Sequence, residues 1–158
     1  MNAAILCAGA LKEKWQKEGC QEYLKRLSRY GRYEVIEVPD EKEPEHASDA
    51  IRGQIVEKEG RALLAKVKPN DRVVALAIRA KAPDSEGLAG MVRQWEMDGR
   101  RVVFVIGASL GLSGEVLARA DEAISFSNMT FPHPLMRVIL LEQLYRAAKI
   151  NAGERYHK

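Results

Sequence analysis

The stretch RVVFVIGASLGLSGEVL, residues 101–117, decides the fold class. Its first part, Arg101–Ile106, is almost continuously apolar, which is typical of a strand that is buried on both faces of a sheet. A glycine-rich loop follows, and Ser113–Ala120 has the pattern of a short helix. A buried strand that leads through a loop into a helix indicates an α/β protein with a parallel sheet.

The same alternation continues through the rest of the chain. Four further apolar runs predict strands, at Ala3–Ala8, Tyr33–Val38, Arg72–Ile78 and Glu122–Ser127. Helical patterns lie between and after them, at Lys12–Tyr30, Ser48–Val67, Ser85–Asp98 and Pro134–Ile150. Ser48 is a suitable N-cap for its helix. We therefore predict a single, mostly parallel sheet flanked by helices, in one domain that covers residues 1–158.

Composition and charge exclude several classes. The 158 residues are 46% hydrophobic and 30% charged, as in ordinary globular proteins. No apolar run reaches the roughly 18 residues of a membrane span, and no basic segment precedes the first apolar run, so we expect no signal peptide and a cytoplasmic location. Cys7 and Cys20 have no disulfide or metal-ligand spacing, and we expect both to be buried and no metal to bind. The net charge of +3 permits a nucleic-acid partner without requiring one.

Three glycines, Gly107, Gly111 and Gly114, follow the strand of the opening stretch. Glycine allows a close approach of the backbone to a ligand, and a helix N-terminus favours polar or anionic groups, so a nucleotide-like ligand is plausible here. A tight turn without a ligand explains the same residues. The G-x-G-x-x-G motif after the first strand and the P-loop motif are both absent, which disfavours NAD binding and NTP hydrolysis.

The segment SNMTFPHPLMR, Ser127–Arg137, is rigid and half apolar. Two prolines enclose His133, and Pro134 suits the first position of a helix. A histidine held in this way favours a role in a site, although a structural hydrogen bond is the alternative. Arg137 falls among apolar positions of the helix, where an unpaired cation would be costly. It either pairs with a carboxylate of the fold or meets a ligand anion, and we favour the ligand.

The last helix is apolar over most of its circumference, which predicts cover on two sides, by the sheet and by a partner subunit. The chain then ends in GERYHK, whose cations and rings suit stacking on a base and contact with phosphate. A solvated end is the alternative. A second candidate RNA patch, or a solvated helix face, combines Lys25, Arg26, Arg29 and Arg32 with Tyr23, Tyr30 and Tyr33.

Several of these stretches together resemble the RlmH family, the SPOUT-class methyltransferases of bacterial large-subunit ribosomal RNA. The resemblance covers nearly the whole chain, and the stretches that carry it are VIEVPDEK, KEG at residues 58–60, FVIGASLGL, SFSNMTFPHPLMRVILLEQLYRA and YHK. It implies a SPOUT fold with a C-terminal trefoil knot, a homodimer with the knot helices at its interface, and methylation of N3 of a pseudouridine in the helix 69 hairpin of 23S rRNA on the assembled ribosome.

The resemblance also implies a site for S-adenosylmethionine in the knot loops. The matching positions are Leu76, Gly107, Phe126, Ser127, Asn128, Met129, Thr130 and Phe131. Where the family often has two glycines, this chain has Gly107-Ala108, and we expect the alanine to be tolerated.

The candidate catalytic residues of this reaction are His133, Arg137, Tyr156 and His157. His133 is the first candidate for the general base, and Tyr156 or His157 of a partner's tail is the second. Arg137 would orient the carbonyls of the target base or an RNA phosphate. A non-catalytic protein that binds a nucleotide-like ligand or the ribosome, and a flavodoxin-like module, remain as alternatives.

Overall fold

A computed structural model describes all residues, 1–158, and contains one five-stranded sheet with the strand order β2-β1-β4-β3-β5. The strands are β1 (Asn2–Ala8), β2 (Arg32–Val38), β3 (Arg72–Lys81), β4 (Val102–Ile106) and β5 (Glu122–Ile124). All neighbouring strands are parallel. The central strand β4 is buried along its whole length, which confirms the prediction from the apolar run Arg101–Ile106. The neighbouring strand β1 is buried from Ala3 onward, whereas the second half of β3 is partly exposed.

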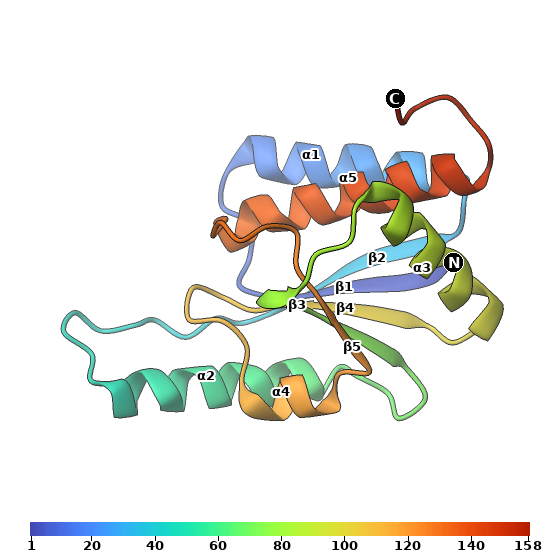
Figure 1. Cartoon of the computed structure of the whole chain (residues 1–158). Helices are drawn as coiled ribbons and strands as arrows, with labels where there is room; N and C mark the ends of the chain where they lie inside the picture. Colours follow the sequence, from blue (N-terminus) through green and yellow to red (C-terminus); the bar gives the residue numbers. More distant parts are fainter.

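Five helices cover the two faces of this sheet (Figure 1). They are α1 (Lys14–Leu27), α2 (Asp49–Leu64), α3 (Ser85–Asp98), α4 (Gly114–Arg119) and α5 (His133–Asn151). Helices α1, α3 and α5 lie on one face, and α2 and α4 lie on the other. Ser48, Asp84 and Ser113 cap the starts of α2, α3 and α4, because each side chain accepts a hydrogen bond from a backbone N–H of the first turn. None of the helices is long and apolar enough to span a membrane.

Each face of the sheet has its own hydrophobic core. On the α5 side, Phe104 packs edge-on against Trp95, with ring centroids 5.6 Å apart, and the buried leucines of α5 complete the layer. On the opposite side, the core joins the strands to α2 and α4. A Cβ at Gly60 of α2 would lie 2.2 Å from the Oγ of Ser113, so only glycine allows these two helices to approach so closely.

Helix α5 has no fully exposed residue, because α1 and α3 lie along its two flanks and the sheet lies beneath it (Figure 1). Much of the cover that its apolar circumference requires therefore comes from the same chain. The partner subunit at this helix stays a prediction.

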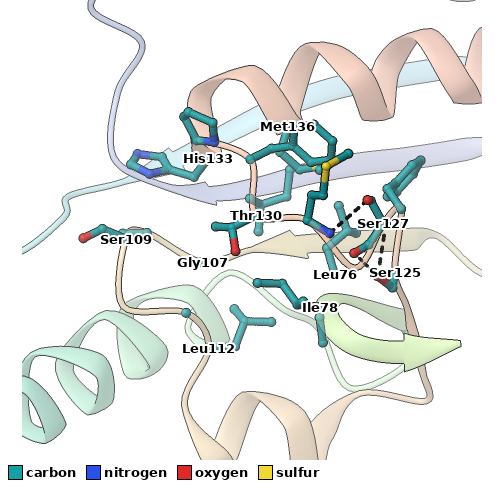
Figure 2. A pocket seen from close by; sticks show the side chains of 18 of the residues that line it. Leu76, Ile78, Gly107, Ser109, Leu112, Ser125, Ser127, Thr130, His133 and Met136 are labelled. Atoms are coloured by element: carbon teal, nitrogen blue, oxygen red, sulfur yellow. Dashed lines mark hydrogen bonds between the residues drawn. The ribbon is translucent and has the colours of Figure 1, made fainter. Parts of the chain in front are cut away.

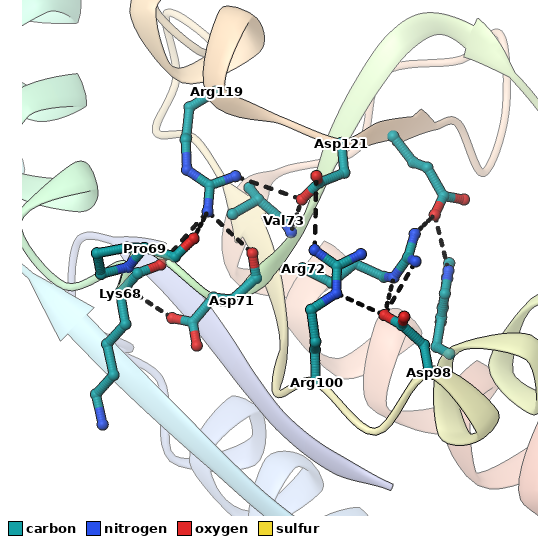
Figure 3. Close-up of polar contacts among 11 residues, drawn as sticks. Lys68, Pro69, Asp71, Arg72, Val73, Asp98, Arg100, Arg119 and Asp121 are labelled. Carbon is teal, nitrogen blue, oxygen red and sulfur yellow. Dashed lines mark hydrogen bonds and ion pairs between the residues drawn. The ribbon is translucent and has the colours of Figure 1, made fainter.

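Ion pairs connect the starts of β3, β4 and β5, at the amino end of the sheet (Figure 3). Arg72 bridges Asp98 and Glu122, while Arg101 binds Asp71. Although burial opposes it, hydrogen bonds from Arg101 and from the N–H of Lys68 hold the pKa of Asp71 below its usual value. These ion pairs therefore stabilise the amino end of the sheet, at the opposite end from the carboxyl ends of the strands.

Candidate functional site

A cavity of about 760 Å³ opens at the carboxyl ends of β3, β4 and β5 (Figure 2). Its walls come from β3 (residues 76–78), from the last residue of β4 and the loop after it (residues 106–112), and from the segment that runs from the end of β5 into the first turn of α5 (within residues 124–136). In parallel α/β proteins, ligands bind in the crevice outside the carboxyl ends of the strands. The fold therefore places this cavity where a ligand is expected.

The loop after β4 folds back tightly on itself. A Cβ at Gly107 would lie 2.4 Å from the carbonyl oxygen of Gly111, so a side chain at Gly107 would collide with backbone. Gly111 has a φ of +86°, which favours glycine, and its N–H donates to the carbonyl of Ala108. Ala108 does not have a positive φ, so alanine is compatible with the backbone at the position where the family often has glycine.

The segment after β5 is shaped by serine hydroxyl groups. Ser125 Oγ donates to the carbonyl of Ser127 and accepts from its N–H, and Ser127 Oγ accepts from the N–H of Met129. These turns end the strand at Ile124, three residues before the predicted end. They also lay the backbone of this segment along the wall of the cavity (Figure 2).

The cavity brings together most of the residues predicted for the cofactor. Those that line it are Leu76, Gly107, Phe126, Ser127, Met129, Thr130 and Phe131. Asn128 is not among the lining residues. The sequence did not single out Ile78 or Leu112, whose side chains also face the cavity (Figure 2).

His133 is the one titratable residue in the cavity wall, at the first position of α5. Burial lowers its pKa, and so does the nearby charge of Arg137, while Asp40 acts in the opposite direction. A lowered pKa keeps the imidazole neutral near pH 7, which is the form that can accept a proton.

Arg137 lies outside the cavity wall, and its side chain is 1% exposed. Its guanidinium forms an ion pair with Glu37 of β2 and donates to the carbonyl of Gly9 at 2.9 Å. Of the two alternatives drawn from the sequence, the structure thus contains the pairing with a carboxylate of the fold, although the ligand had been favoured. The contacts tie the first turn of α5 to the ends of β1 and β2.

The two tail residues fold back onto α5 of their own chain, away from the cavity wall. The Tyr156 hydroxyl donates to Glu142 at 3.0 Å, and its ring lies 4.9 Å from that of Tyr145. Arg146 stacks on Tyr156 and approaches His157 Nδ1 at 3.4 Å. A catalytic role for either tail residue therefore requires another chain or another position of the tail.

The candidate RNA patch on α1 is built from stacked cations and rings. Arg26 lies over the rings of Tyr23 and Tyr145, and Arg29 lies over the ring of Tyr30. This arrangement holds the guanidinium groups against an aromatic surface. Arg26 also pairs with Glu22 at 2.7 Å, so part of the positive charge of this patch is already balanced.

Asp40, in the loop after β2, was not among the residues predicted for the site. The Asp40 carboxyl carbon and His133 Nε2 lie 3.3 and 3.4 Å from the point where a Cβ would stand at Gly9. Asp40 is therefore a close neighbour of the histidine in the cavity wall. The motif VIEVPDEK, which contains both Glu37 and Asp40, was the available signal.

Comparisons with known proteins agree with this geometry. Residues 1–157 match the family model described as predicted SPOUT methyltransferase. Proteins named ribosomal RNA large subunit methyltransferase H are similar over the full length of both chains, at 55% identity in Bifidobacterium animalis subsp. lactis, 53% in Bacillus thuringiensis and 52% in an Exiguobacterium species.

Two solved structures share the fold at low sequence identity. A probable methyltransferase from Bordetella pertussis Tohama I has a TM-score of 0.58 at 16% identity, with 93% of this chain and 94% of that chain covered. A probable methylase family protein from Haemophilus influenzae Rd KW20 has a TM-score of 0.55 at 11% identity, with 99% of this chain and 70% of that chain covered. With the full-length match to the family model, these findings show that this chain belongs to the SPOUT methyltransferase family.

Proposed function

We propose that this chain is a methyltransferase of large-subunit ribosomal RNA that uses S-adenosylmethionine. The observation that carries the proposal is the identity of 52–55%, over the full length of both chains, with proteins named ribosomal RNA large subunit methyltransferase H. The proposed site for the methyl donor is the cavity at the carboxyl end of the sheet.

The composition of the cavity wall suits S-adenosylmethionine. Its volume lies within the roughly 300–1,000 Å³ of small-molecule sites. Leu76, Ile78 and Leu112 give apolar surface for the adenine ring, and the folded loop after Gly107 offers backbone groups for its polar edges. No lysine or arginine lines the cavity, so a positively charged sulfonium meets no opposing cation in the wall.

The substrate in this proposal is N3 of a pseudouridine in the helix 69 hairpin of 23S rRNA, on the assembled ribosome. The cofactor supplies a reactive sulfonium methyl group, so the chain contributes mainly by holding the target nitrogen in line with it. The N3 proton has to leave, and in this proposal His133, which lines the cavity, accepts it. Arg137, through Glu37 and Gly9, fixes the first turn of the helix that carries His133.

The proposal includes a homodimer, with α5 at its interface and with the cavity loops forming a C-terminal trefoil knot. In such a dimer, Tyr156 and His157 of one chain are candidates to complete the site of the other. The cations of the α1 patch, which include Arg26 and Arg29, would then bind RNA phosphates.

The role of His133 can be tested by replacing it with glutamine, which keeps a polar side chain of similar reach. The rate of methyl transfer from radiolabelled S-adenosylmethionine to ribosomes should fall by at least about 100-fold, the range of a lost general base. Cofactor affinity, measured by calorimetry, should stay close to that of the wild type. A His133→Gln variant that keeps the full transfer rate would remove the base assignment.

A further inference from the structure

Two motifs of the sequence, VIEVPDEK and KEG, meet in the structure through Glu41 and Glu59, which have no part in the proposed site. Glu59 of the KEG motif is 3% exposed on α2, and its Oε1 accepts a hydrogen bond from the N–H of Glu41 at 2.9 Å. Its Oε2 is buried and has no partner. Burial raises the pKa of this carboxyl. A buried acid whose one hydrogen bond goes to a loop backbone is placed to hold that loop.

The residue before Glu41 is Asp40, whose carboxyl group lies beside Gly9, as does the imidazole ring of His133. Gly9 has a φ of +87° and no side chain that would fill the space next to these two groups. Asp40 Cγ is 3.3 Å and His133 Nε2 is 3.4 Å from the point that a Gly9 Cβ would occupy.

The charged groups that act on His133 come from three elements. Arg137 lies on α5, Lys12 lies on the loop after β1, and Asp40 lies on the loop after β2. Arg137 and Lys12 disfavour a charged imidazole, and Asp40 is the group among the three that favours it.

We propose that Asp40 is a positioning residue for His133, and that Glu59 holds Asp40 in place through the backbone of Glu41. This inference rests on the proposed function, in which His133 accepts the proton of the target nitrogen. No hydrogen bond or ion pair joins the two side chains, so Asp40 acts on the imidazole through its charge, which favours the protonated ring. As the bond from N3 to the methyl carbon forms and the bond from sulfur to that carbon breaks, the N3 proton passes to His133. Asp40 stabilises the resulting imidazolium, which later releases the proton to water.

The coupling can be measured without any methyl transfer, by NMR titration of the imidazole signals. The chain has only three histidines, His46, His133 and His157, so the signals can be assigned by single substitutions. Asp40→Asn should lower the pKa of His133, because it removes the charge that favours the imidazolium. Glu45→Gln is the matched control, since it removes the same charge from the same loop at a residue that does not act on His133. The control should leave the pKa of His133 unchanged.

The part of Glu59 is tested by a pair of variants. Glu59→Ala removes the acceptor for the Glu41 N–H and should lower the pKa of His133 as Asp40→Asn does. Glu59→Gln keeps an acceptor oxygen and should behave as the wild type, which also shows that the site is folded. Adding Glu59→Ala to Asp40→Asn should cause no further change in that pKa, because both act through the same carboxylate.

The reaction gives the second readout. In Asp40→Asn, kcat for methyl transfer should fall by about tenfold, less than for the loss of His133 itself, with the KM for S-adenosylmethionine unchanged. The inference is overturned if Asp40→Asn leaves the pKa of His133 unchanged, or shifts it no more than Glu45→Gln does. If the pKa falls as expected but the wild-type protein methylates no RNA, the proposed function fails and the effect of the Asp40 charge on His133 stands.

Discussion

Replacing Glu37 with glutamine tests whether Arg137 is held by the fold. The change removes the negative charge beside a guanidinium whose side chain is 1% exposed, while that of Glu37 is 40% exposed. Breaking a fully buried ion pair costs about 3–5 kcal/mol and breaking a surface pair costs about 0–1 kcal/mol. Because the pair lies between these limits and glutamine still accepts a hydrogen bond, we expect a loss of about 1.5 kcal/mol. For a chain of this length, that loss lowers the melting temperature by about 3–6 °C.

Urea unfolding, followed by tryptophan fluorescence, measures this loss as a lower midpoint with an unchanged m-value. Glu34→Gln is the matched control on the same strand, since Glu34 is 52% exposed and pairs with Arg101 at 3.5 Å. It should change the free energy of unfolding by less than about 0.5 kcal/mol. A Glu37→Gln variant as stable as this control, but with weaker cofactor binding, would refute the reasoning and return Arg137 to the ligand.

Three further predictions follow from single residues. Gly107→Ala should weaken S-adenosylmethionine binding at least about tenfold in calorimetry, because the new Cβ collides with backbone, whereas Ala108→Gly should stay within about twofold of the wild type. Gly60→Ala should lower the free energy of unfolding, measured in urea, by about 1–3 kcal/mol, because the new Cβ forces two helices apart. Gly53→Ala in the same helix meets open space and should raise the free energy of unfolding by about 0.5–1 kcal/mol. Burial raises the pKa of the Cys7 thiol to about 12 from an unperturbed 9.0, so its contribution to stability is full below pH 9 and is lost as the pH rises toward 12. Urea midpoints should therefore fall above about pH 9, and a thiol reagent at about pH 8 should label Cys7 only after unfolding.

Much of the fold could be predicted because its signals are local. The helix Ser85–Asp98 has both ends at the predicted residues, and Ser48 caps its helix as predicted. The strand order could not be predicted, because a continuous apolar run shows that a strand is central without naming its neighbours. The end of β5 was placed three residues too late, since hydroxyl groups of Ser125 and Ser127 form turns that compete with the sheet.

The residues of the candidate site could be predicted where they lie close together in one segment of the sequence. The segment Ser127–Arg137, which contains His133, contributes much of the cavity wall, as expected from its rigid and apolar sequence. The partner of Arg137 was not found, because Glu37 lies 100 residues away in the chain and the two meet only when α5 packs on the sheet. Asp40 was missed for a related reason. The sequence around a charged loop residue does not show which residues of other elements lie near it in the fold.

The central claim is methyl transfer to ribosomal RNA, and one labelling experiment tests it most directly. The protein is incubated with radiolabelled S-adenosylmethionine and either assembled ribosomes that lack the modification or free 23S rRNA, and any labelled nucleotide is mapped. We predict label on assembled ribosomes, at N3 of one pseudouridine in the helix 69 hairpin. No label on ribosomes or on free RNA, from protein that binds the cofactor, would contradict the account and favour a non-catalytic protein or a different acceptor.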